Sequence, residues 1–269
     1  MIEAQLIETF LLVTINHQSL IATKARRIVR AAGGRAIMEF GARRAHNFDA
    51  ANFGARAAYI GGVAGTATTY AGQKFKMPVL GTMAHSFVQS FDSEYEAFLT
   101  YAQSYPESCT VLLDTYDTLH SGLPNAIKVA KQYLEPNGYR LAGVRIDSGD
   151  IAYLSKKIRK ALDGAGMQDC SIVVSNSLDE YLITSLISQG AQINSMGVGE
   201  NLVCSKSTPV FGGVYKLSSV FEGEKNIPKI KVSENVEKVT NPGYKDLYRI
   251  YDKESGMAPV SYTHLRAHE

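Results

Sequence analysis

Histidine, aspartate, arginine and serine residues stand directly after several short apolar runs of the sequence. The run Val79–Met83, for example, is followed closely by His85 and Ser86. An imidazole at the end of a buried strand destabilises the fold unless it is hydrogen bonded or takes part in chemistry. Taken alone, such a histidine is more often a hydrogen-bonded structural residue. A functional role for His85 is favoured by the residues that follow the other apolar runs, because they too are of types that bind ligands or react.

Each predicted strand end carries groups that bind ligands or react. In a β/α barrel the carboxyl ends of the strands lie on one face, so these groups would converge there. For Asp150 and Ser121, helix capping is a better explanation than ligand binding. Capping does not, however, explain a polar cluster at every strand end. The clusters are Glu39, Phe40, Gly41, Arg43 and Arg44; Thr66; His85 and Ser86; Asp114, Thr115 and Asp117; Arg145, Asp147, Ser148 and Asp150; Ser175, Asn176 and Ser177; and Gly197, Val198 and Gly199.

These residue types indicate binding of a phosphorylated sugar. Arg145 can hold two phosphate oxygens at once, and the backbone at Gly197 and Gly199 can approach a phosphate closely. Asp114 and Asp147 can bind ribose hydroxyls or a Mg²⁺ ion that neutralises a diphosphate. A tight turn explains the two glycines equally well. The sequence contains no Walker loop, no Rossmann fingerprint and no G-x-S-x-G motif.

The elements that would position these residues alternate between strand and helix from Arg35 onward. Four apolar runs begin at an even spacing, which is the length of a βα unit, and the alternation predicts a parallel sheet with right-handed crossovers. The predicted fold class is α/β, with a TIM-like β/α barrel, complete or incomplete, as the catalytic domain over residues 35–210. The predicted strands are 36–40, 65–70, 79–83, 110–113, 141–146, 172–174 and 193–198.

The helices between these strands have recognisable starts and ends. Ser93 and Glu96 form a capping-box pattern, Ser121 with Pro124 indicates another helix start, and Gly164 can end the helix that follows Asp150. A further helix is predicted to bury residues 178, 182, 186 and 187 on one face.

The regions outside residues 35–210 have different patterns. Residues 1–34 predict a helical lead-in made of two helices. Residues 211–256 predict part of a second domain, a partial antiparallel β domain with strands over 214–221, 228–232 and 247–251. Residues 257–269, MAPVSYTHLRAHE, continue neither pattern and resemble translated adapter DNA, so we expect a non-native tail.

Composition excludes several classes of protein. The net charge of +2 among 269 residues gives no basic excess, so we expect neither a nucleic-acid partner nor a membrane partner. The apolar runs are shorter than a membrane span. The three cysteines, Cys109, Cys170 and Cys204, lack metal-ligand spacing and predict reduced thiols in a cytoplasmic protein.

Several motifs appear in the order in which one enzyme family has them, and the chain closely resembles the nicotinate phosphoribosyltransferases, a type II phosphoribosyltransferase family. The resemblance covers residues 5 to 256. The motifs are EFGARRA (39–45), GTMAHS (81–86), LLDTYDT (112–118), SGLPNA (121–126), VRIDSGD (144–150), VVSNSLDE (173–180), GVGENLV (197–203) and GGVYKL (212–217).

The resemblance implies a reaction in NAD biosynthesis. Nicotinate and phosphoribosyl pyrophosphate form nicotinate mononucleotide and pyrophosphate, coupled to ATP hydrolysis and with Mg²⁺ as cofactor. His85 matches the histidine that ATP phosphorylates, and Phe40 matches an aromatic that stacks on the pyridine ring. The resemblance also implies a homodimer when full length and chain beyond both ends of this sequence, so that the sequence is an internal fragment.

The resemblance assigns the remaining site residues as follows. Arg43 matches an arginine near the ring substituent. Ala67, beside Thr66, matches an aspartate that accepts a hydrogen bond from the amide in nicotinamide-using relatives, so alanine there predicts a carboxylate substrate. Ser86 follows the phosphorylated histidine in its motif. The family residues that hold ribose, phosphate and the ring region correspond here to Asp114, Arg145 and Asp147. The phosphate and ribose loops of the family correspond to Ser175, Asn176, Gly197 and Gly199.

Other functions remain open on the sequence. A nicotinamide or quinolinate phosphoribosyltransferase has the same fold. A sugar-phosphate aldolase or isomerase would be favoured by a lysine at a strand end, and none of the predicted ends has one. The third alternative is a truncated remnant without catalytic activity.

Overall fold

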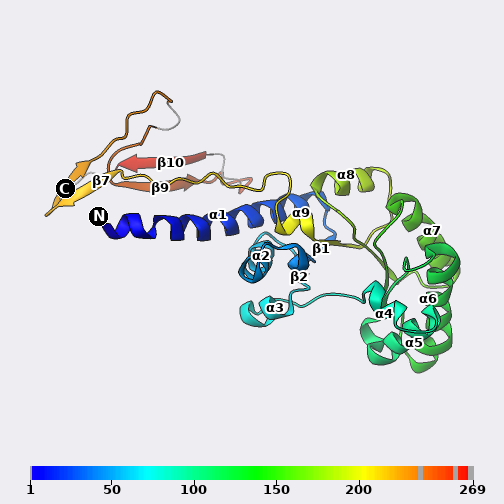
Figure 1. The fold of residues 1–269 in the computed structure, drawn as a ribbon. Coiled ribbons are helices and arrows are strands. Elements are labelled where there is room, and N and C mark those ends of the chain that lie inside the picture. The colour runs from blue at the N-terminus through cyan, green and yellow to red at the C-terminus, as the bar shows by residue number, and fades with distance from the viewer. Residues whose placement is uncertain (1, 236–238, 257–259, 266–269) are drawn as a thin grey trace. The chain divides into compact units, whose positions relative to one another are not determined.

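The computed structural model describes residues 2–235, 239–256 and 260–265, which fall into two compact units (Figure 1). Unit 1 combines Met1–Leu12 with Gly213–Glu269, and unit 2 is Val13–Gly212. Every residue proposed for the site lies in unit 2. Among the described residues, no helix has both the length and the apolar character needed to cross a membrane.

A parallel sheet of six strands forms the centre of unit 2. Its order is β2-β1-β6-β5-β4-β3, so the last strand of the unit pairs with the first, with Ala36 opposite Ser195. The strands predicted for this unit are confirmed except for one; their bounds are shorter than predicted, apart from β5, which begins one residue earlier. They are β1 (Ala36–Glu39), β2 (Gly65–Thr66), β3 (Thr110–Leu112), β4 (Gly143–Ile146), β5 (Ser171–Val174) and β6 (Ser195–Val198).

The strand predicted over residues 79–83 is wrong. Val79 makes only an isolated parallel bridge to Thr66, and the chain then leaves the ladder before α4 (His85–Gln89) begins. This segment is held by a side chain and not by a neighbouring strand. Arg145 Nη1 donates to Thr82 Oγ1 at 3.0 Å and to the Met83 carbonyl at 3.4 Å. In the described part of the chain, no strand ladder joins this segment to β3.

Helices connect the strands as the alternation predicts. Residues 1–34, however, contain one continuous helix, α1 (Ile2–Ala31), instead of two, because nothing in the segment between the two apolar stretches breaks a helix. The other helices are α2 (Phe48–Ile60), α3 (Thr69–Phe75), α5 (Glu94–Ser104), α6 (Leu123–Val129), α7 (Ile151–Gly164), α8 (Glu180–Ser188) and α9 (Glu200–Val203).

Two predicted helix caps are confirmed, one is corrected, and the buried face of one helix is corrected. Ser93 and Asp150 accept hydrogen bonds from the amides of Glu96 and Tyr153. Asp117, not Ser121, caps the helical stretch before α6, and the Ser121 hydroxyl donates to Glu94 Oε2 instead. Of the residues predicted to be buried around α8, residues 178 and 186 are buried and residue 187 packs against the core. Residue 182 is 36% exposed instead, and Ile183 takes the inward position.

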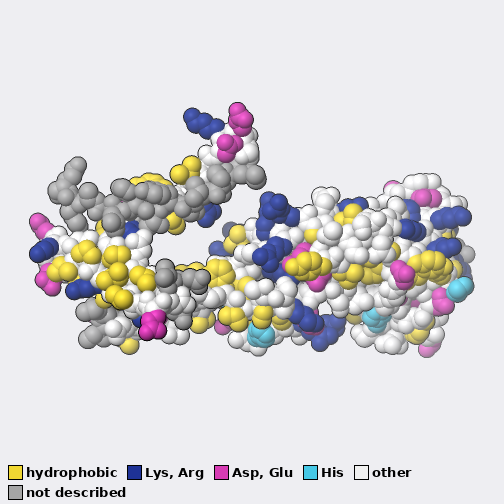
Figure 2. Space-filling model, turned by 90° about the horizontal axis from the view of Figure 1, so that it is seen from above, with side chains coloured by type: hydrophobic (Ala, Val, Ile, Leu, Met, Phe, Trp, Pro, Cys, Tyr) yellow, Lys and Arg dark blue, Asp and Glu magenta, His cyan; other side chains and the backbone are white. Residues whose placement is uncertain are grey.

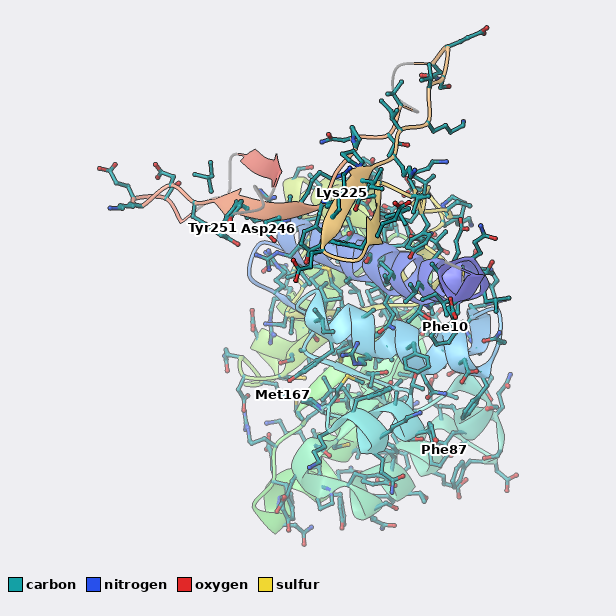
Figure 3. All side chains as sticks on the ribbon, turned by 90° about the vertical axis from the view of Figure 1, so that its left-hand side faces the viewer. Phe10, Phe87, Met167, Lys225, Asp246 and Tyr251 are labelled. Atoms are coloured by element: carbon teal, nitrogen blue, oxygen red, sulfur yellow. The ribbon has the colours of Figure 1, made fainter. Side chains whose placement is uncertain are left out.

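The main apolar core lies between the helices and one face of the sheet. Ile21 and Ile28 of α1, Phe98 of α5 and Val144 of β4 are all buried in it. At its edge the Phe87 ring, labelled in Figure 3, lies 5.9 Å from that of Tyr101 and holds α4 against α5. This packing fixes the strand ends on which the polar residues stand.

Unit 1 consists of short antiparallel pairs. β7 (Ser219–Glu222) pairs with β8 (Lys225–Pro228) across a turn at Gly223, whose positive φ of 62° suits glycine. The turn sets the register, so the first two strands predicted here are displaced. Hydrophobic side chains remain exposed over this unit (Figure 2), including Leu247 at 70%.

The third strand predicted in this unit corresponds to β9 (Lys245–Ile250). It pairs antiparallel with β10 (Val260–Leu265), a segment that the sequence analysis left out of the fold. That residues 257–269 are a non-native tail stays a prediction.

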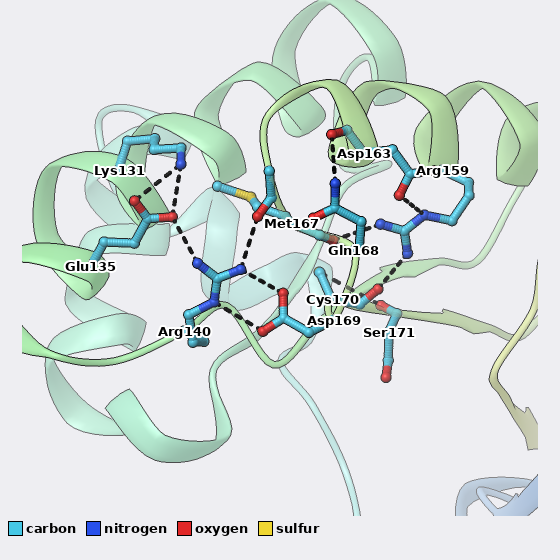
Figure 4. A network of polar contacts seen from close by, with 11 residues as sticks. Lys131, Glu135, Arg140, Arg159, Asp163, Met167, Gln168, Asp169, Cys170 and Ser171 are labelled. Carbon is cyan, nitrogen blue, oxygen red and sulfur yellow. Dashed lines mark hydrogen bonds and ion pairs between the residues drawn. The ribbon is translucent and has the colours of Figure 1, made fainter.

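An ion network lies at the amino ends of β4 and β5, shown in Figure 4. Arg140 donates to both carboxylate oxygens of Asp169, at 2.9 and 2.6 Å, and pairs with Glu135 at 3.3 Å. Arg159 donates to the carbonyls of Met167 and Cys170 at 2.6 and 2.7 Å. These contacts join the segments that enter the two strands.

Candidate active site

The carboxyl ends of the strands in unit 2 open onto two adjoining clefts. The histidine cleft, of about 440 Å³, is lined by Phe40, Arg43, Ala67, Gly81, Thr82, Met83, Ala84, His85, Ser86, Leu112, Arg145 and Asp147. The loop cleft, of about 160 Å³, is lined by Phe40, Arg43, Arg44, Arg145, Asp147, Ser175, Asn176, Ser177, Leu178, Gly197, Gly199, Glu200 and Asn201. Four side chains line both clefts and so form their shared wall: Phe40, Arg43, Arg145 and Asp147.

Arg145 is the most heavily bonded side chain of this wall. Its Nε donates to Ser175 Oγ at 2.9 Å, its Nη2 lies 3.3 Å from Asp147 Oδ2, and only 15% of the side chain is exposed. Its guanidinium carbon also lies 5.5 Å from the centre of the Phe40 ring. The arginine is therefore held in one orientation between the two clefts, as bidentate recognition of an anion requires.

Asp147 and Asp114 form a connected pair of carboxylates. The amide of Asp147 donates to Asp114 Oδ2 at 2.9 Å, and the Ser148 hydroxyl donates to the same oxygen. Asp114 Oδ1 is buried and has no hydrogen-bond partner among the described residues. A buried oxygen without a partner costs free energy, so this atom has unused capacity for a cation or a hydroxyl group.

His85 is hydrogen bonded at one ring nitrogen and faces a carboxylate with the other. Its Nδ1 lies 3.1 Å from Thr115 Oγ1, and its Nε2 lies 3.8 Å from Asp147 Oδ2. The side chain is 40% exposed in the histidine cleft. The structure thus gives this imidazole an orienting hydroxyl on one side and a carboxylate on the other, which is an arrangement suited to a nucleophile or a proton carrier.

The two glycines at the end of β6 border the loop cleft and approach Phe40. A Cβ atom on Gly197 would lie 2.3 Å from two carbons of the Phe40 ring, and one on Gly199 would lie 3.2 Å from the Phe40 carbonyl oxygen. Gly197 therefore leaves room for the aromatic ring, a role that its spacing in the sequence does not reveal.

The loop after β5 has an uncommon backbone. Asn176 and Ser177 have positive φ angles of 94° and 49°, which side chains other than glycine rarely adopt. Asn201 holds this loop, because its Nδ2 donates to the carbonyls of Ser177 and Leu178 at 2.7 and 3.1 Å. The strain brings Asn176 to the rim of the loop cleft.

Thr66 is turned inward, away from both clefts. It is 1% exposed, and its hydroxyl donates to Glu39 Oε2 at 2.6 Å. The neighbouring Ala67 is exposed and lines the histidine cleft, so tight packing does not account for its small side chain. Ser86 is likewise exposed at the rim of that cleft.

Sequence reasoning singled out most of this site but missed several contributors. Thr82 and Asn201 hold Arg145 and the strained loop. Glu39 was among the predicted strand-end groups, but it lies buried below the shared wall and not at the cleft surface. An acidic residue inside the apolar run AIMEF was the available signal for Glu39. Nothing in the sequence indicates the contacts of the other two.

Comparisons with known proteins show the family to which the chain belongs. Residues 35–246 match the model of the nicotinate phosphoribosyltransferase (NAPRTase) family. The chain is 49% identical to a nicotinate phosphoribosyltransferase of Bacillus subtilis, over 98% of this chain and 54% of that one. It therefore spans about half the length of the curated relatives that it matches.

Solved structures agree with the family match. The human nicotinic acid phosphoribosyltransferase superposes with a TM-score of 0.80 at 30% identity, covering 97% of this chain and 58% of the human one. A nicotinate-nucleotide pyrophosphorylase from Pyrococcus furiosus gives a TM-score of 0.72 at 26% identity, covering 96% and 60%.

Proposed function

The chain belongs to the nicotinate phosphoribosyltransferase family, and we propose that it carries the phosphoribosyl-transfer site of such an enzyme. The reaction joins nicotinate to phosphoribosyl pyrophosphate, gives nicotinate mononucleotide and pyrophosphate, and is coupled to ATP hydrolysis through a phosphohistidine. The observation that carries this proposal is the shared wall of Phe40, Arg43, Arg145 and Asp147 between two clefts. One cleft suits the phosphorylated sugar, and the other contains the histidine.

The pyridine ring would lie against the shared wall. Phe40 offers an aromatic face, and the exposed Arg43 offers a cation to the ring carboxylate. Ala67, across the histidine cleft, adds no negative charge that would repel a carboxylate. These contacts would hold the ring nitrogen ready for attack on the anomeric carbon as the bond from that carbon to the diphosphate breaks.

The sugar phosphates would be held by Arg145, by the backbone of the loop after β5 and by the backbone at Gly199. The transition state develops positive charge on the sugar, so positioning and electrostatics do most of the work. Asp147, 3.3 Å from the Arg145 guanidinium, can face this charge as an ionised carboxylate.

The residues present also fit a Mg²⁺ ion. Asp114 Oδ1 is a buried oxygen without a partner among the described residues, and oxygen is the ligand that Mg²⁺ prefers. No group of three or more His, Cys, Asp or Glu side chains in the described residues could enclose a metal, so the substrate diphosphate would supply further ligands. When bound, the ion would neutralise the leaving diphosphate.

His85 would accept the phosphoryl group of ATP. We propose that its Nδ1–H donates to Thr115 Oγ1, which leaves the lone pair on Nε2, facing Asp147. Attack by Nε2 on the γ-phosphorus forms the N–P bond as the bond to ADP breaks. Asp147 would steady the positive charge that develops on the imidazole.

The test compares two histidines in a chain extended to the full length of the relatives. We expect His85→Ala to abolish both the acid-labile, base-stable phosphate label and the stimulation of nucleotide formation by ATP. His120→Ala is the control, because that ring is 85% exposed and pairs with Asp117 outside both clefts. Undiminished labelling of His85→Ala would contradict the phosphohistidine.

The proposal extends to the wider properties of the protein. The order of the parallel sheet, in which β6 pairs with β1, supports a β/α barrel, and the family supports a homodimer in the cytoplasm that works in NAD biosynthesis. No lysine lines either cleft among the described residues, so nothing favours an aldolase. Offering nicotinamide and quinolinate as alternative substrates in the same assay distinguishes a nicotinate enzyme from a nicotinamide or quinolinate phosphoribosyltransferase. A full-length chain without activity would identify a non-catalytic remnant.

A further inference from the structure

A buried carboxylate lies below the site and belongs to none of the steps above. Glu39, the last residue of β1, is 0% exposed, and the described residues provide no cation to pair with it. Instead it accepts hydrogen bonds from the backbone amide of Gly41 and from the hydroxyls of Thr66 and Thr68, the latter two at 2.6 and 3.2 Å. A buried acid without a counter-ion is costly unless its surroundings use it.

The three donors belong to the two segments that carry the ring-binding residues. Gly41 follows Phe40 and precedes Arg43 in the short 3₁₀ helix Ala42–Arg44, which leads away from β1. Thr66 and Thr68 flank Ala67 at the end of β2, where Thr66 Oγ1 also accepts from the Thr68 amide at 2.9 Å. One carboxylate therefore joins both sides of the histidine cleft from below.

The geometry around Glu39 leaves little freedom. A Cβ atom on Gly41 would lie 2.8 Å from Glu39 Oε1 and 2.5 Å from the Val203 Cβ, so only glycine brings its amide onto the carboxylate. Burial raises the pKa of Glu39, while the hydrogen bonds from Thr66, Gly41 and Thr68 act in the opposite direction. All three contacts are donors to the acid, so each is lost or rearranged when an oxygen is replaced.

We propose that Glu39 is a positioning residue for recognition of the pyridine ring: its carboxylate fixes Phe40 and Arg43 on one side, and Ala67 on the other, at the separation that the ring requires. The inference rests on the proposed function, because it names the ring as the ligand. Glu39 itself lines neither cleft, so it acts through these neighbours.

The first test measures the two segments directly and needs no ligand. We expect Glu39→Gln to speed amide hydrogen exchange at Gly41, whose amide donates to Glu39 Oε1, and at Thr68, whose amide donates to the Thr66 hydroxyl that Glu39 Oε2 holds. The NH2 group of glutamine only donates, so it cannot replace a carboxylate oxygen as the acceptor of these contacts. Thr66→Val should expose the Thr68 amide in the same way. Unchanged exchange at both amides in Glu39→Gln would overturn the proposal.

Glu94→Gln is the matched control. Glu94 is also a buried carboxylate, 4% exposed, that accepts from the Ser121 hydroxyl and the Asn125 amide group and lines neither cleft. It should lower the melting temperature as much as Glu39→Gln does, without altering exchange at Gly41 or Thr68. A general loosening of the fold would instead appear in both variants.

The second test measures binding in a chain of the relatives' full length. Glu39→Gln should weaken nicotinate binding about tenfold, the usual cost of one buried hydrogen bond left unmade, with the Kd of phosphoribosyl pyrophosphate unchanged. The double variant with Thr66→Val should lose little more than either single variant, because both act through one contact. An equal loss for both substrates, or additive losses, would show that Glu39 only stabilises the fold.

These outcomes separate the two proposals. If the wild-type chain binds nicotinate and the exchange and binding effects appear, but no nucleotide forms, then the transferase function fails while the role of Glu39 stands. If nucleotide forms normally and Glu39→Gln leaves nicotinate binding unchanged, then the role of Glu39 fails while the function stands. A wild-type chain that binds no nicotinate overturns both.

Discussion

The two ends of the sheet around β4 and β5 both have charged residues, at the amino ends of both strands and at the carboxyl end of β4, and the two ends use them differently. At the amino ends, Arg140, Asp169 and Arg159 are bonded to one another's segments, and each guanidinium is occupied by carboxylates and backbone carbonyls (Figure 4). At the carboxyl ends, Arg145 and Asp147 face two clefts, together with His85. Arginine and aspartate occur at both ends, so residue type alone does not explain the difference.

The difference lies in unused bonding capacity. The amino-end network is exposed, with about half of the Arg140 and Asp169 side chains in solvent, and its bonds are complete within the protein. The carboxyl-end cluster is mostly buried, yet it leaves Asp114 Oδ1 without a partner and His85 partly exposed. Solvent-exposed ion pairs contribute little to stability, whereas buried groups with spare capacity indicate ligand binding. A charged residue in the sequence therefore indicates a binding site only when one also knows at which end of the strand it stands.

Exchanging arginine for lysine at both ends gives the largest expected contrast. Arg145→Lys should lower kcat/KM by about 100- to 1,000-fold, because lysine cannot reproduce a bidentate contact. The free energy of unfolding should fall by about 1–3 kcal/mol, because lysine cannot replace the hydrogen bonds from Arg145 to Ser175, Thr82 and Met83. Arg140→Lys is the matched control and should leave kcat/KM unchanged.

Steady-state kinetics and melting curves of the two variants measure this contrast. If Arg145→Lys fails to fold while Arg140→Lys is active, the arginine of the shared wall is structural and the comparison between the strand ends breaks down.

A smaller effect is expected at the end of β2, where a substitution adds a negative charge at position 67. Ala67→Asp should lower kcat/KM for nicotinate about tenfold, because a carboxylate there repels the substrate carboxylate and solvent screens part of that repulsion. Use of nicotinamide should fall far less or rise. Parallel kinetics with both substrates provide the measurement. An equal loss for both would mean that residue 67 affects packing and not substrate choice.

The sequence predicts the carboxyl-end cluster well, because apolar run, polar cluster and helix follow one another at a regular spacing. It predicts the path of residues 79–83 wrongly, since the neighbour of that segment is the Arg145 side chain and not a strand. The same limit applies to Glu39, Thr82 and Asn201, whose contacts cross between elements distant in the chain. Local periodicity reports burial and strand order, but side-chain pairing depends on how the ends of different strands meet.

The smallest expected effect is a pH dependence of stability at the amino ends. Hydrogen bonds and charge attraction from Arg140 lower the pKa of Asp169 below its ordinary value. A carboxyl group with a lowered pKa in the folded state stabilises the fold above its unfolded pKa of about 4, and this contribution is lost as the pH falls through the folded pKa. Asp169→Asn should therefore melt below the wild type at pH 7 by no more than about 3 °C, because the pair is exposed.

The difference in melting temperature between Asp169→Asn and the wild type should shrink toward zero as the pH falls below about 4, while kcat/KM at neutral pH stays that of the wild type. Melting curves recorded across this pH range in low salt measure it, and added salt should reduce the difference further, since exposed charges are screened. A difference that persists at acid pH would show that Asp169 stabilises the entry to β5 through its shape and hydrogen bonds and not through its charge. A loss of activity would be the more serious result, because the amino ends would then be coupled to the site that the carboxyl ends form.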